Sequence, residues 1–345
     1  MDRGTPLLVI GHKNPDTDSI CSAIGYASYK REVVGDEAVA CRAGSINAQT
    51  RFALDRFTAE DPRQVVDVLP RLSDIMIPRD ELILARPEQT LREAYEIIIE
   101  RRFSFLPVVD ENDHCLGHIT TLGLASLLGR LADEDRTSAF SLLASLVREH
   151  LEPIGPTFPA DTTIREAERL VNRYNEGGFV VTDADGRIAG IVTRVNFMTD
   201  SRFRVALVDH NEYSQSVDGI EAAAVVEIID HHRIGLHRTA EPITVINRVV
   251  GSTCTIVADM YRQAGRSPDA RTAGLLLSGI VSDTVVLNSP TTTGVDRDLA
   301  TWLAERAGVG VSEYGREMFA AGSDTHALTA RELLGKDRKH YEEKK

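Results

Sequence analysis

The sequence predicts an α/β fold in which a parallel, doubly wound sheet domain is interrupted by a repeated α+β module. Short apolar runs alternate with segments of helical spacing near both ends of the chain, which is typical of parallel sheets. The middle of the chain repeats one order of helices and strands, and this favours an inserted module. Several apolar runs end in aspartate or histidine, at the position where open α/β sheets place their sites.

The expected elements divide the chain into consecutive segments. The first α/β half contains strands at 7–10 and 38–42 and helices at 20–30 and 48–57, and the second half begins with strands at 202–210 and 223–232. We therefore expect a sheet domain formed by residues 1–70 and 201–325, an inserted module at 71–200, and a linker or the start of a truncated further domain at 326–345.

The composition is that of an ordinary globular protein. The 345 residues include 42% hydrophobic and 26% charged side chains, enough for more than one buried core. A formal net charge of −13 without a basic stripe argues against a nucleic-acid partner, because phosphate contacts need clustered Lys and Arg. The four cysteines form no C-x-x-C pair, and neither a signal peptide nor an apolar run of about 20 residues is found. We expect a soluble, cytoplasmic protein with free thiols and no membrane association.

The inserted module consists of two copies of one pattern. In the first copy, a short helix and a strand precede a helix at 91–102, two strands and a closing helix. The second copy has the same order without the opening short helix. Thr90 in the first copy, and Thr162 or Thr163 in the second, are expected to cap the helices, because acidic residues follow them.

Each copy then closes on a Gly-x-x-Thr run, GHITTLG in the first and GIVTRVN in the second. The module resembles a tandem pair of CBS domains over residues 71–199. The resemblance implies that Thr193 and Asn196, and in the first copy Thr120, contact a bound adenine nucleotide such as AMP, ADP or ATP. Gly123 stands where the family has an Asp or Asn for the ribose hydroxyls, so the first cleft departs from the family pattern. The resemblance also implies a homodimer, and the alternative is a dimerisation scaffold without a ligand.

Four loops carry the candidate chemistry. They contain His12, Asp16 and Asp18; Asp209 to Glu212; Asp230 to His232; and Asp283. Taken singly, these aspartates could be helix caps or turn residues, and the neighbours His231 and His232 cannot both face one side of a strand. Taken together, Asp and His at four buried strand ends need compensation for lost hydration, and divalent cations provide it. The ligand types favour two ions of manganese, cobalt or magnesium over a structural zinc.

The motifs GHKNPDTDS, DHN, DHH and SDT, in this order, resemble those of the DHH phosphoesterase superfamily and specifically of the family II inorganic pyrophosphatases. Together with the inserted pair, they resemble the nucleotide-regulated CBS-pyrophosphatase branch. The resemblance implies one metal on His12 and Asp16, a second on Asp18, His231 and Asp283, and a bridge through Asp209. It further implies His232 as an acid or hydrogen-bond donor to the phosphate, Mn²⁺ or Co²⁺ as cofactor, and pyrophosphate with Mg²⁺ as substrate.

Some features leave alternatives open. Asn211 is expected either to orient a ligand or to form a turn, and residues 251–253 open a helix to about Gln263 that could hold an anion or simply be capped. The Arg-Lys motif of the family's C-terminal substrate domain is not found after Asp283, so we expect that domain to be missing. The alternatives to an active pyrophosphatase are a weak or inactive adenine-nucleotide sensor and, less favoured, a DHH phosphodiesterase.

Overall fold

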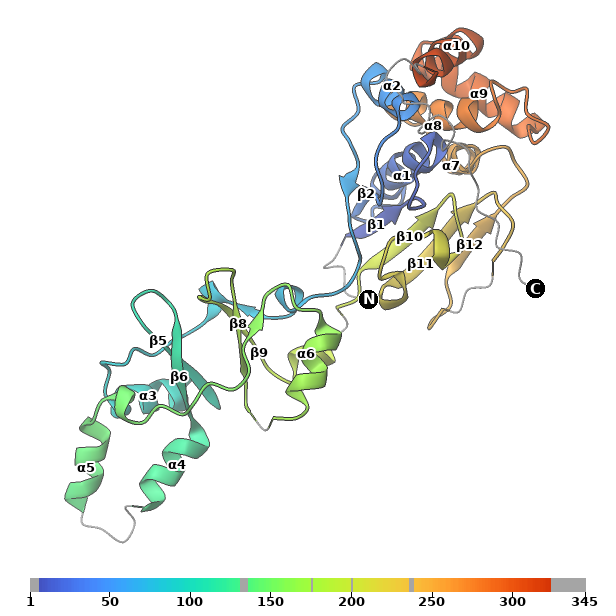
Figure 1. Cartoon of the computed structure of the whole chain (residues 1–345). Helices are drawn as coiled ribbons and strands as arrows, with labels where there is room; N and C mark the ends of the chain where they lie inside the picture. The colour runs from blue at the N-terminus through green and yellow to red at the C-terminus, as the bar shows by residue number, and fades with distance from the viewer. Residues whose placement is uncertain (1–5, 131–135, 175, 200, 236–238, 324–345) are drawn as a thin grey trace, which may run out of the picture. The chain divides into compact units, whose positions relative to one another are not determined.

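The computed structural model describes residues 6–130, 136–174, 176–199, 201–235 and 239–323. The chain divides into two compact units (Figure 1). Unit 1 combines Met1–Leu69 with Phe203–Lys345, and unit 2 consists of Pro70–Arg202. The expected linker or further domain at 326–345 lies outside the described residues.

Unit 1 is built on a parallel sheet, which confirms the predicted fold class. In chain order its strands are β1 (Leu7–Ile10), β2 (Ala38–Arg42), β3 (Arg63–Gln64), β10 (Arg204–Val208), β11 (Ala224–Asp230) and β12 (Thr244–Asn247). Their order in the sheet is β12-β11-β10-β1-β2-β3, and every pairing is parallel. From β1 the sheet continues through β2 to β3 at one edge, and from β10 it continues through β11 to β12 at the other edge. The strand order therefore reverses between the two central strands, β1 and β10.

The helices of unit 1 are α1 (Thr17–Tyr29), which continues into the π-helical turn η1 (Lys30–Val34), α2 (Ala48–Arg56), α7 (Thr253–Gln263), α8 (Ala270–Asp283), α9 (Gly294–Ala307) and α10 (Val311–Gly322). α1 begins three residues before the predicted start at Ile20, because the Asp16 side chain caps it by accepting a 2.9 Å hydrogen bond from the backbone N–H of Ser19.

The two faces of the sheet are covered differently. Leu7 and Val9 belong to the core formed with these helices, whereas Leu8 and Ile10 belong to a smaller core on the opposite face. The short 3-10 helices η6 (Tyr213–Gln215) and η7 (Ile220–Ala222) border that second core, which also takes in Val68. β1 is therefore buried on both sides, as its unbroken apolar run predicts.

Unit 2 contains the predicted repeat. The first copy comprises η2 (Leu72–Asp74), β4 (Ile77–Pro78), η3 (Arg79–Glu81), α3 (Leu91–Arg101), β5 (Phe105–Val109), β6 (Cys115–Thr120) and α4 (Thr121–Arg130). After α5 (Arg136–Ala144), the second comprises η4 (Val147–Glu149), β7 (Phe158–Pro159), α6 (Ile164–Val171), β8 (Phe179–Thr182), β9 (Ile188–Val192) and η5 (Asn196–Met198). Thr90 and Thr163 each form a capping box with the Glu three residues later, so Thr163 rather than Thr162 is the cap.

The prediction that the second copy lacks an opening short helix is wrong. η4 is that helix, and each opening segment pairs with the other copy. The Leu72 N–H donates to the Thr162 carbonyl at 2.9 Å, and the Val147 N–H donates to the Gln89 carbonyl at 2.8 Å. Likewise β4 pairs with β9 of the second copy, and Glu152 forms an antiparallel bridge to β6 of the first. Neither copy is complete without the other's opening segment.

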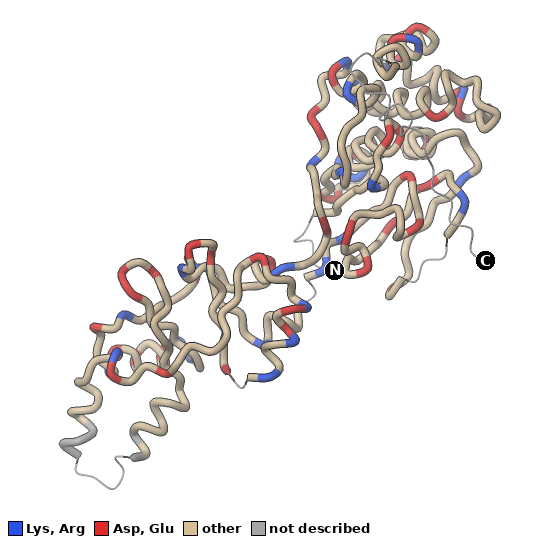
Figure 2. Tube along the Cα trace, in the orientation of Figure 1, with Lys and Arg blue, Asp and Glu red and all other residues tan. Residues whose placement is uncertain are grey.

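Charged side chains are spread over both units. Figure 2 shows acidic and basic residues interspersed along the trace of each unit. Among the described helices, none is long and apolar enough to cross a membrane.

Candidate metal centre

The candidate ligands lie at the carboxyl ends of three neighbouring parallel strands. His12 follows β1 by two residues, Asp209 directly follows β10, and His231 directly follows β11. Parallel neighbours end at the same edge of a sheet, and β11, β10 and β1 are adjacent in this one (Figure 1). The three side chains therefore meet where the strand order reverses, which is where open α/β sheets form a crevice.

Asp283 reaches the same place from a helix, and the expectation of a fourth strand end is wrong. Asp283 is the last residue of α8. The apolar run before it is compatible with a buried strand or a buried helix, and periodicity alone does not separate the two. α8 packs along α1. Its C-terminus brings the Asp283 carboxylate to 3.5 Å from His231 Nε2.

The structure brings all six predicted ligands together in two clusters that share one aspartate. The first contains His12, Asp16 and Asp209, and the second contains Asp18, Asp209, His231 and Asp283. Within each cluster the candidate ligand atoms lie within 4.8 Å of one another. The two oxygens of Asp209 are divided between them, because Oδ2 lies 3.5 Å from His12 Nε2 and Oδ1 lies 3.4 Å from His231 Nε2.

The sequence leaves open whether Asp16 caps a helix or is a metal ligand, and its position in the structure fits both roles. Its Oδ1 caps α1 through the Ser19 N–H, and its Oδ2 lies 3.5 Å from His12 Nε2. A carboxylate has two oxygens, so one side chain can cap a helix and also face a metal site. The helix start therefore fixes the position of a candidate ligand.

Asp18 is fully buried and is held by the N-terminus of α7. Ser252 Oγ and the Cys254 N–H donate to Asp18 Oδ1 at 2.7 and 3.0 Å, and the Thr253 N–H donates to Oδ2 at 2.7 Å. The sequence suggests an anion at this helix start, and the anion found there is the protein's own carboxylate. Ser252 is also the N-cap of α7, so the segment both caps the helix and holds an anionic group.

The turn that presents Asp209 is anchored from two sides. Asp209 has a φ of 61°, a left-handed conformation that is uncommon outside glycine. Thr253 Oγ1 donates to Asp209 Oδ1 at 3.0 Å. The neighbouring His210 is buried, with Nδ1 2.9 Å from the Val208 carbonyl and Nε2 2.6 Å from Ser216 Oγ. Sequence reasoning missed Thr253 and His210 as supports of this turn, since nothing local marks either contact.

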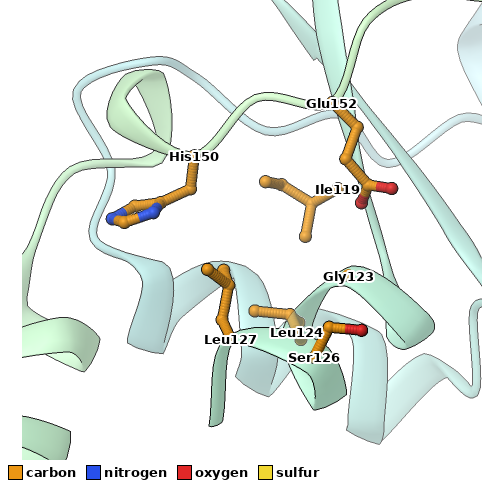
Figure 3. Close-up of a pocket in the computed structure, with 7 residues that line it drawn as sticks. All are labelled: Ile119, Gly123, Leu124, Ser126, Leu127, His150 and Glu152. Carbon is orange, nitrogen blue, oxygen red and sulfur yellow. The ribbon is translucent and has the colours of Figure 1, made fainter. Parts of the chain in front are cut away.

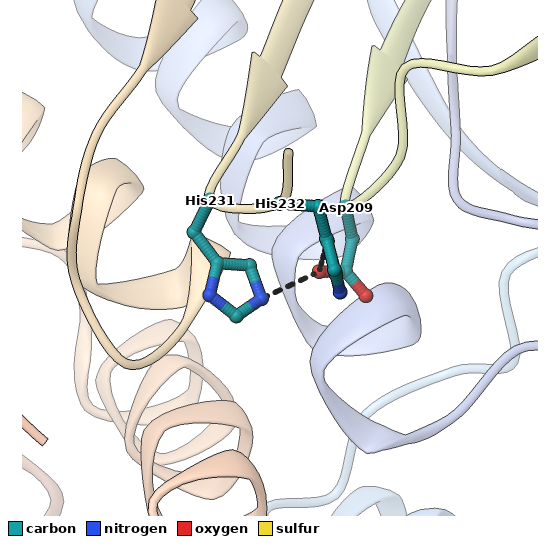
Figure 4. Close-up of side chains that lie close together, drawn as sticks. All are labelled: Asp209, His231 and His232. Atoms are coloured by element: carbon teal, nitrogen blue, oxygen red, sulfur yellow. Dashed lines mark ion pairs between the residues drawn. The ribbon is translucent and has the colours of Figure 1, made fainter. Parts of the chain in front are cut away.

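His231 and His232 both approach Asp209, as Figure 4 shows. Their ring centroids are 4.3 Å apart, and Asp209 Oδ1 lies 3.4 Å from His231 Nε2 and 3.9 Å from His232 Nδ1. The rule that neighbouring residues of a strand face opposite sides does not apply here, because β11 ends at Asp230 and both histidines lie beyond it. His231 Nδ1 donates to the Val250 carbonyl at 3.1 Å, which leaves Nε2 to face the carboxylates.

Asp230 is an anchor that sequence reasoning did not identify. It is fully buried, and its Oδ1 accepts hydrogen bonds from the backbone N–H groups of His231 and His232. The same oxygen lies 2.9 Å from His232 Nδ1, and Asn211 Nδ2 donates to Oδ2 at 2.5 Å. Asn211 Oδ1 in turn accepts from the Gly235 N–H. Asn211 thus holds both Asp230 and the following loop.

Burial and mutual charge shift the protonation of the clusters. Burial opposes a charge on His12, but the carboxylates of Asp16 and Asp209 raise its pKa to about 10. Burial also opposes a charge on His231, whereas Asp209 and Asp18 raise its pKa to about 9. Burial and the neighbouring Asp209 charge raise the pKa of Asp18 to about 7. Carboxylates that attract protons so strongly also attract divalent cations, so protons and metal ions compete here.

The residues present fit a pair of divalent cations. Asp209 Oδ2 and His231 Nε2 are buried without a hydrogen-bond partner, and each belongs to a cluster. The four carboxylates of the two clusters match the charge of two divalent ions. Burial raises the pKa of Cys21 and Cys254 well above the usual value, so these thiols stay protonated beside the clusters. An oxygen and imidazole donor set without thiolate suits manganese, cobalt or magnesium.

The predicted residues of unit 2 lie at the closing runs of the two copies. In the second copy, the N–H and Oγ1 of Thr193 donate to Asn196 Oδ1 at 2.8 and 2.7 Å. In the first copy, the N–H and Oγ1 of Thr120 donate instead to Glu152 Oε1 at 2.9 and 2.8 Å. Gly123, which lacks a side chain, donates its N–H to Thr120 Oγ1 at 2.9 Å.

Comparison with known proteins supports the reading of unit 1. Residues 6–280 match the family described as the DHH family, N-terminal domain. A Clostridium perfringens cobalt-dependent inorganic pyrophosphatase is 26% identical over 97% of this chain and 80% of its own length. A probable manganese-dependent inorganic pyrophosphatase of Thermotoga maritima is 27% identical with the same coverage. A relative of that name from Oceanobacillus iheyensis is 28% identical, and the chain spans 66% of it.

Solved structures give a similar result. A Methanococcus jannaschii protein, named as a candidate family II inorganic pyrophosphatase, superposes with a TM-score of 0.51 and 25% identity. The match covers 94% of this chain and 64% of that one. The chain therefore spans about two thirds to four fifths of the length of the relatives it matches.

Proposed function

Because the chain belongs to the DHH family, we propose that it hydrolyses inorganic pyrophosphate to two phosphates with two divalent metal ions. One observation carries this proposal: the two oxygens of Asp209 face two separate clusters of candidate ligands. A carboxylate placed in this way could hold two cations close together, and two-metal sites stabilise both the attacking and the leaving oxygen of an in-line displacement at phosphorus. The names of the relatives support pyrophosphate as the substrate and manganese or cobalt as the metals.

Each cluster supplies one metal site in this proposal. His12 and Asp16 would hold the first ion, Asp18, His231 and Asp283 would hold the second, and Asp209 would offer one oxygen to each. The fixed side chains support these roles, because helix caps and strand ends hold them before any ion arrives. When bound, the two cations would supply positive charge to the phosphoryl oxygens, including those of a Mg²⁺-bound substrate, and would acidify the attacking water.

His232 is proposed as the group that donates a proton or hydrogen bond to the phosphate. Its side chain is 53% exposed, whereas those of Asp18, Asp209 and His231 are at most 12% exposed, so substrate can reach it. Its Nδ1 is directed at the Asp230 carboxylate, which leaves Nε2 for the substrate. The hydrogen bond to Asp230 raises the pKa of His232 although burial opposes this, so the imidazole keeps a proton to donate.

Regulation by adenine nucleotides at unit 2 is the second part of the proposal, with Thr193 and Asn196 as the contacts. Its support is the closing turn itself: the Asn196 side chain is placed between the Thr193 N–H and the Ile75 carbonyl. A homodimer is proposed from the resemblance alone.

Contacts inside unit 1 offer a route by which unit 2 could influence the metal site. Val68, just before unit 2 begins, donates its N–H to the Asp218 carbonyl at 3.0 Å. Within the same segment, the Gln215 carbonyl accepts from the Lys13 N–H at 2.7 Å, beside His12. Ser216 bonds His210, beside Asp209. One short segment of unit 1 therefore contacts the chain just before the insertion, the residue after His12 and the residue after Asp209.

The experiment is a phosphate-release assay with pyrophosphate and Mn²⁺ or Co²⁺, using Asp209→Asn as the inactive control. Turnover in the parent chain and its loss in the variant support a pyrophosphatase. Binding of AMP or ATP without any turnover would favour the alternative, an adenine-nucleotide sensor with a structural metal site. Turnover of a dinucleotide but not of pyrophosphate would favour the phosphodiesterase.

A further inference from the structure

Unit 2 contains a cavity of about 280 Å³ in its first copy. Figure 3 shows that apolar side chains such as Ile119 and Leu124 form part of its wall and that the Glu152 carboxylate lies at another part. A Cβ atom added to Gly123 would lie only 2.2 Å from Glu152 Oε1, so this carboxylate fills the space beside the closing run. The cavity lies at the run in which Thr120 is expected to contact a nucleotide, so it belongs to the regulation already proposed.

A fully buried carboxylate of unit 1, Asp296, lies outside both clusters and has no part in the proposed reaction. It is the third residue of α9 and completes a capping box, in which the N–H and Oγ1 of Thr293 donate to Asp296 Oδ2, both at 2.6 Å. This cap uses only part of its hydrogen-bonding capacity, because the two oxygens of a carboxylate can accept about four hydrogen bonds. The remaining contacts of Asp296 are made with a different helix, α7.

Asp296 holds the start of α7 at two points. The N–H of Gly251, the residue before the N-cap Ser252, donates to Asp296 Oδ1 and Oδ2 at 3.0 and 2.9 Å. Thr255 Oγ1 donates to Asp296 Oδ1 at 2.6 Å. One carboxylate therefore serves the starts of two helices, which a cap of α9 alone does not require.

The residues between these two contacts hold members of the second cluster. Hydrogen bonds from residues 252–254 reach both Asp18 and Asp209. Directly before Gly251, the Val250 carbonyl accepts a hydrogen bond from His231 Nδ1. The start of α7 thus contacts three of the four side chains of the second cluster, and Asp296 lies behind it.

The packing around Gly251 leaves no room for this arrangement to shift. A Cβ atom added to Gly251 would lie 2.6 Å from Thr284 Cγ2 and 3.1 Å from Asp296 Oδ2. Thr284 directly follows Asp283, the fourth member of the second cluster. The start of α7, the end of α8 and the start of α9 therefore meet at Gly251. Because interiors packed this closely transmit strain, a change at Asp296 reaches the segments that carry or hold all four side chains.

We propose that Asp296 is a positioning residue of the second cluster, because it fixes the start of α7 and the start of α7 fixes the side chains that would hold an ion. The inference rests on the proposed metal pair and adds a group that contacts neither cluster directly. Removing a group that orients a metal ligand typically weakens metal binding by about 10- to 100-fold. Asp296 acts one step further away, so we expect an effect at the lower end of that range.

The test compares two threonines whose hydroxyl groups donate to the same carboxylate. Thr255→Val removes the contact on the α7 side and Thr293→Val removes the one on the α9 side, and both keep a β-branched side chain. Both variants should unfold at a lower temperature. In calorimetric titrations of the full chain, only Thr255→Val should weaken Mn²⁺ binding, by about tenfold. The visible absorption of bound Co²⁺, which depends on ligand geometry, should change in Thr255→Val and keep the parent form in Thr293→Val.

Asp296→Asn replaces one acceptor oxygen by an amide nitrogen and should also weaken Mn²⁺ binding by about tenfold, with the exposed Asp298→Asn on the same helix as control. If Asp296→Asn fails to fold, the comparison of the two threonines decides alone. Equal Mn²⁺ affinities in Thr255→Val and Thr293→Val, whether lowered or at the parent level, would overturn the inference. A parent chain that binds neither Mn²⁺ nor Co²⁺ would refute the metal pair and the inference together. A chain that binds Mn²⁺ without hydrolysing pyrophosphate would refute the proposed function alone.

Discussion

Asp230 Oδ1 lies 2.9 Å from His232 Nδ1, so a fully buried carboxylate orients an imidazole that is half exposed beside the two clusters of candidate ligands. The same carboxylate also binds the backbone N–H groups of both histidines in the turn. The aspartate of the DHH motif thus holds its two histidines in place, while Asp209, Asp18 and Asp283 surround His231.

Replacing Asp230 with Asn should lower turnover by about 100-fold, because the imidazole loses the group that orients it and keeps it protonated. Manganese content should stay at the parent level, since Asp230 is not a member of either cluster. Steady-state kinetics and metal analysis measure the two quantities. Asp298→Asn, an exposed change on α9, is the matched control. Full activity in Asp230→Asn would remove the orienting role.

Asp209→Asn should reduce bound manganese from two ions per chain to one or none. The carboxylate serves both clusters, and an amide offers one oxygen without charge. Metal titration by calorimetry gives the stoichiometry directly, again with Asp298→Asn as control. Retention of two ions at parent affinity would show that Asp209 does not bridge them.

Thr253→Val should weaken manganese binding by about 10- to 100-fold, the usual effect of losing a group that orients a ligand. The change removes the 3.0 Å hydrogen bond to Asp209 Oδ1 and preserves the backbone N–H that holds Asp18. Thr253→Ser keeps the hydroxyl and should restore the affinity. A loss in Thr253→Ser without a loss in Thr253→Val would mean that the methyl packing, and not the hydrogen bond, matters at this position.

The sequence indicates which side chains gather at this site, because their chemistry is local. Asp and His directly after buried strands are costly without compensation, so position alone marks His12, Asp209 and His231 as candidates, and their ligand roles stay a prediction from the family resemblance. The origin of Asp283 was mistaken because an apolar run of that length fits a helix as well as a strand. The contact of Thr253 with Asp209 joins distant segments, and no pattern within either segment indicates it.

The inserted unit shows the same limit. The helix caps of this unit can be predicted from residues a few positions apart, and the repeated order of its helices and strands can be recognised in the sequence. Glu152 takes the place of the missing side chain at Gly123 from 29 positions along the chain, through the exchange of opening segments between the copies. Only the paired fold brings the two positions together, so the sequence predicts that the first copy departs from the family pattern at Gly123 but does not indicate the Glu152 carboxylate beside it.

Two neighbouring threonines, Thr162 and Thr163, precede α6, and only Thr163 is its N-cap. Thr163 Oγ1 accepts from the Glu166 N–H in a capping box, whereas Thr162 makes no contribution of this kind. Thr163→Ala should therefore lower the free energy of unfolding by about 1 kcal/mol. Thr162→Ala, its neighbour and control, should change it by less than about 0.5 kcal/mol. Denaturant titrations distinguish the two, and a reversed order would contradict the assigned cap.

His118 in β6 should make the stability of unit 2 depend on pH. The side chain is 3% exposed and packs on the Phe105 ring at a centroid distance of 4.7 Å. Burial lowers the pKa of His118 below the ordinary 6.5, although Glu152 and Glu176 oppose this. The unfolded chain therefore takes up a proton as pH falls through 6.5 while the folded chain does not, so the free energy of unfolding decreases below that pH.

His118→Phe removes the titrating group and keeps an aromatic ring against Phe105, so this part of the pH dependence should disappear. Unfolding temperatures of the full chain between about pH 5 and 8 measure it, because this window lies on both sides of the ordinary histidine pKa. His114→Asn changes a histidine whose side chain is 47% exposed, near the start of the same strand, and should leave the dependence at the parent level. Equal slopes in His118→Phe and the parent would mean that the buried imidazole accepts its proton without penalty, and that its neighbours Glu152 and Glu176 outweigh burial.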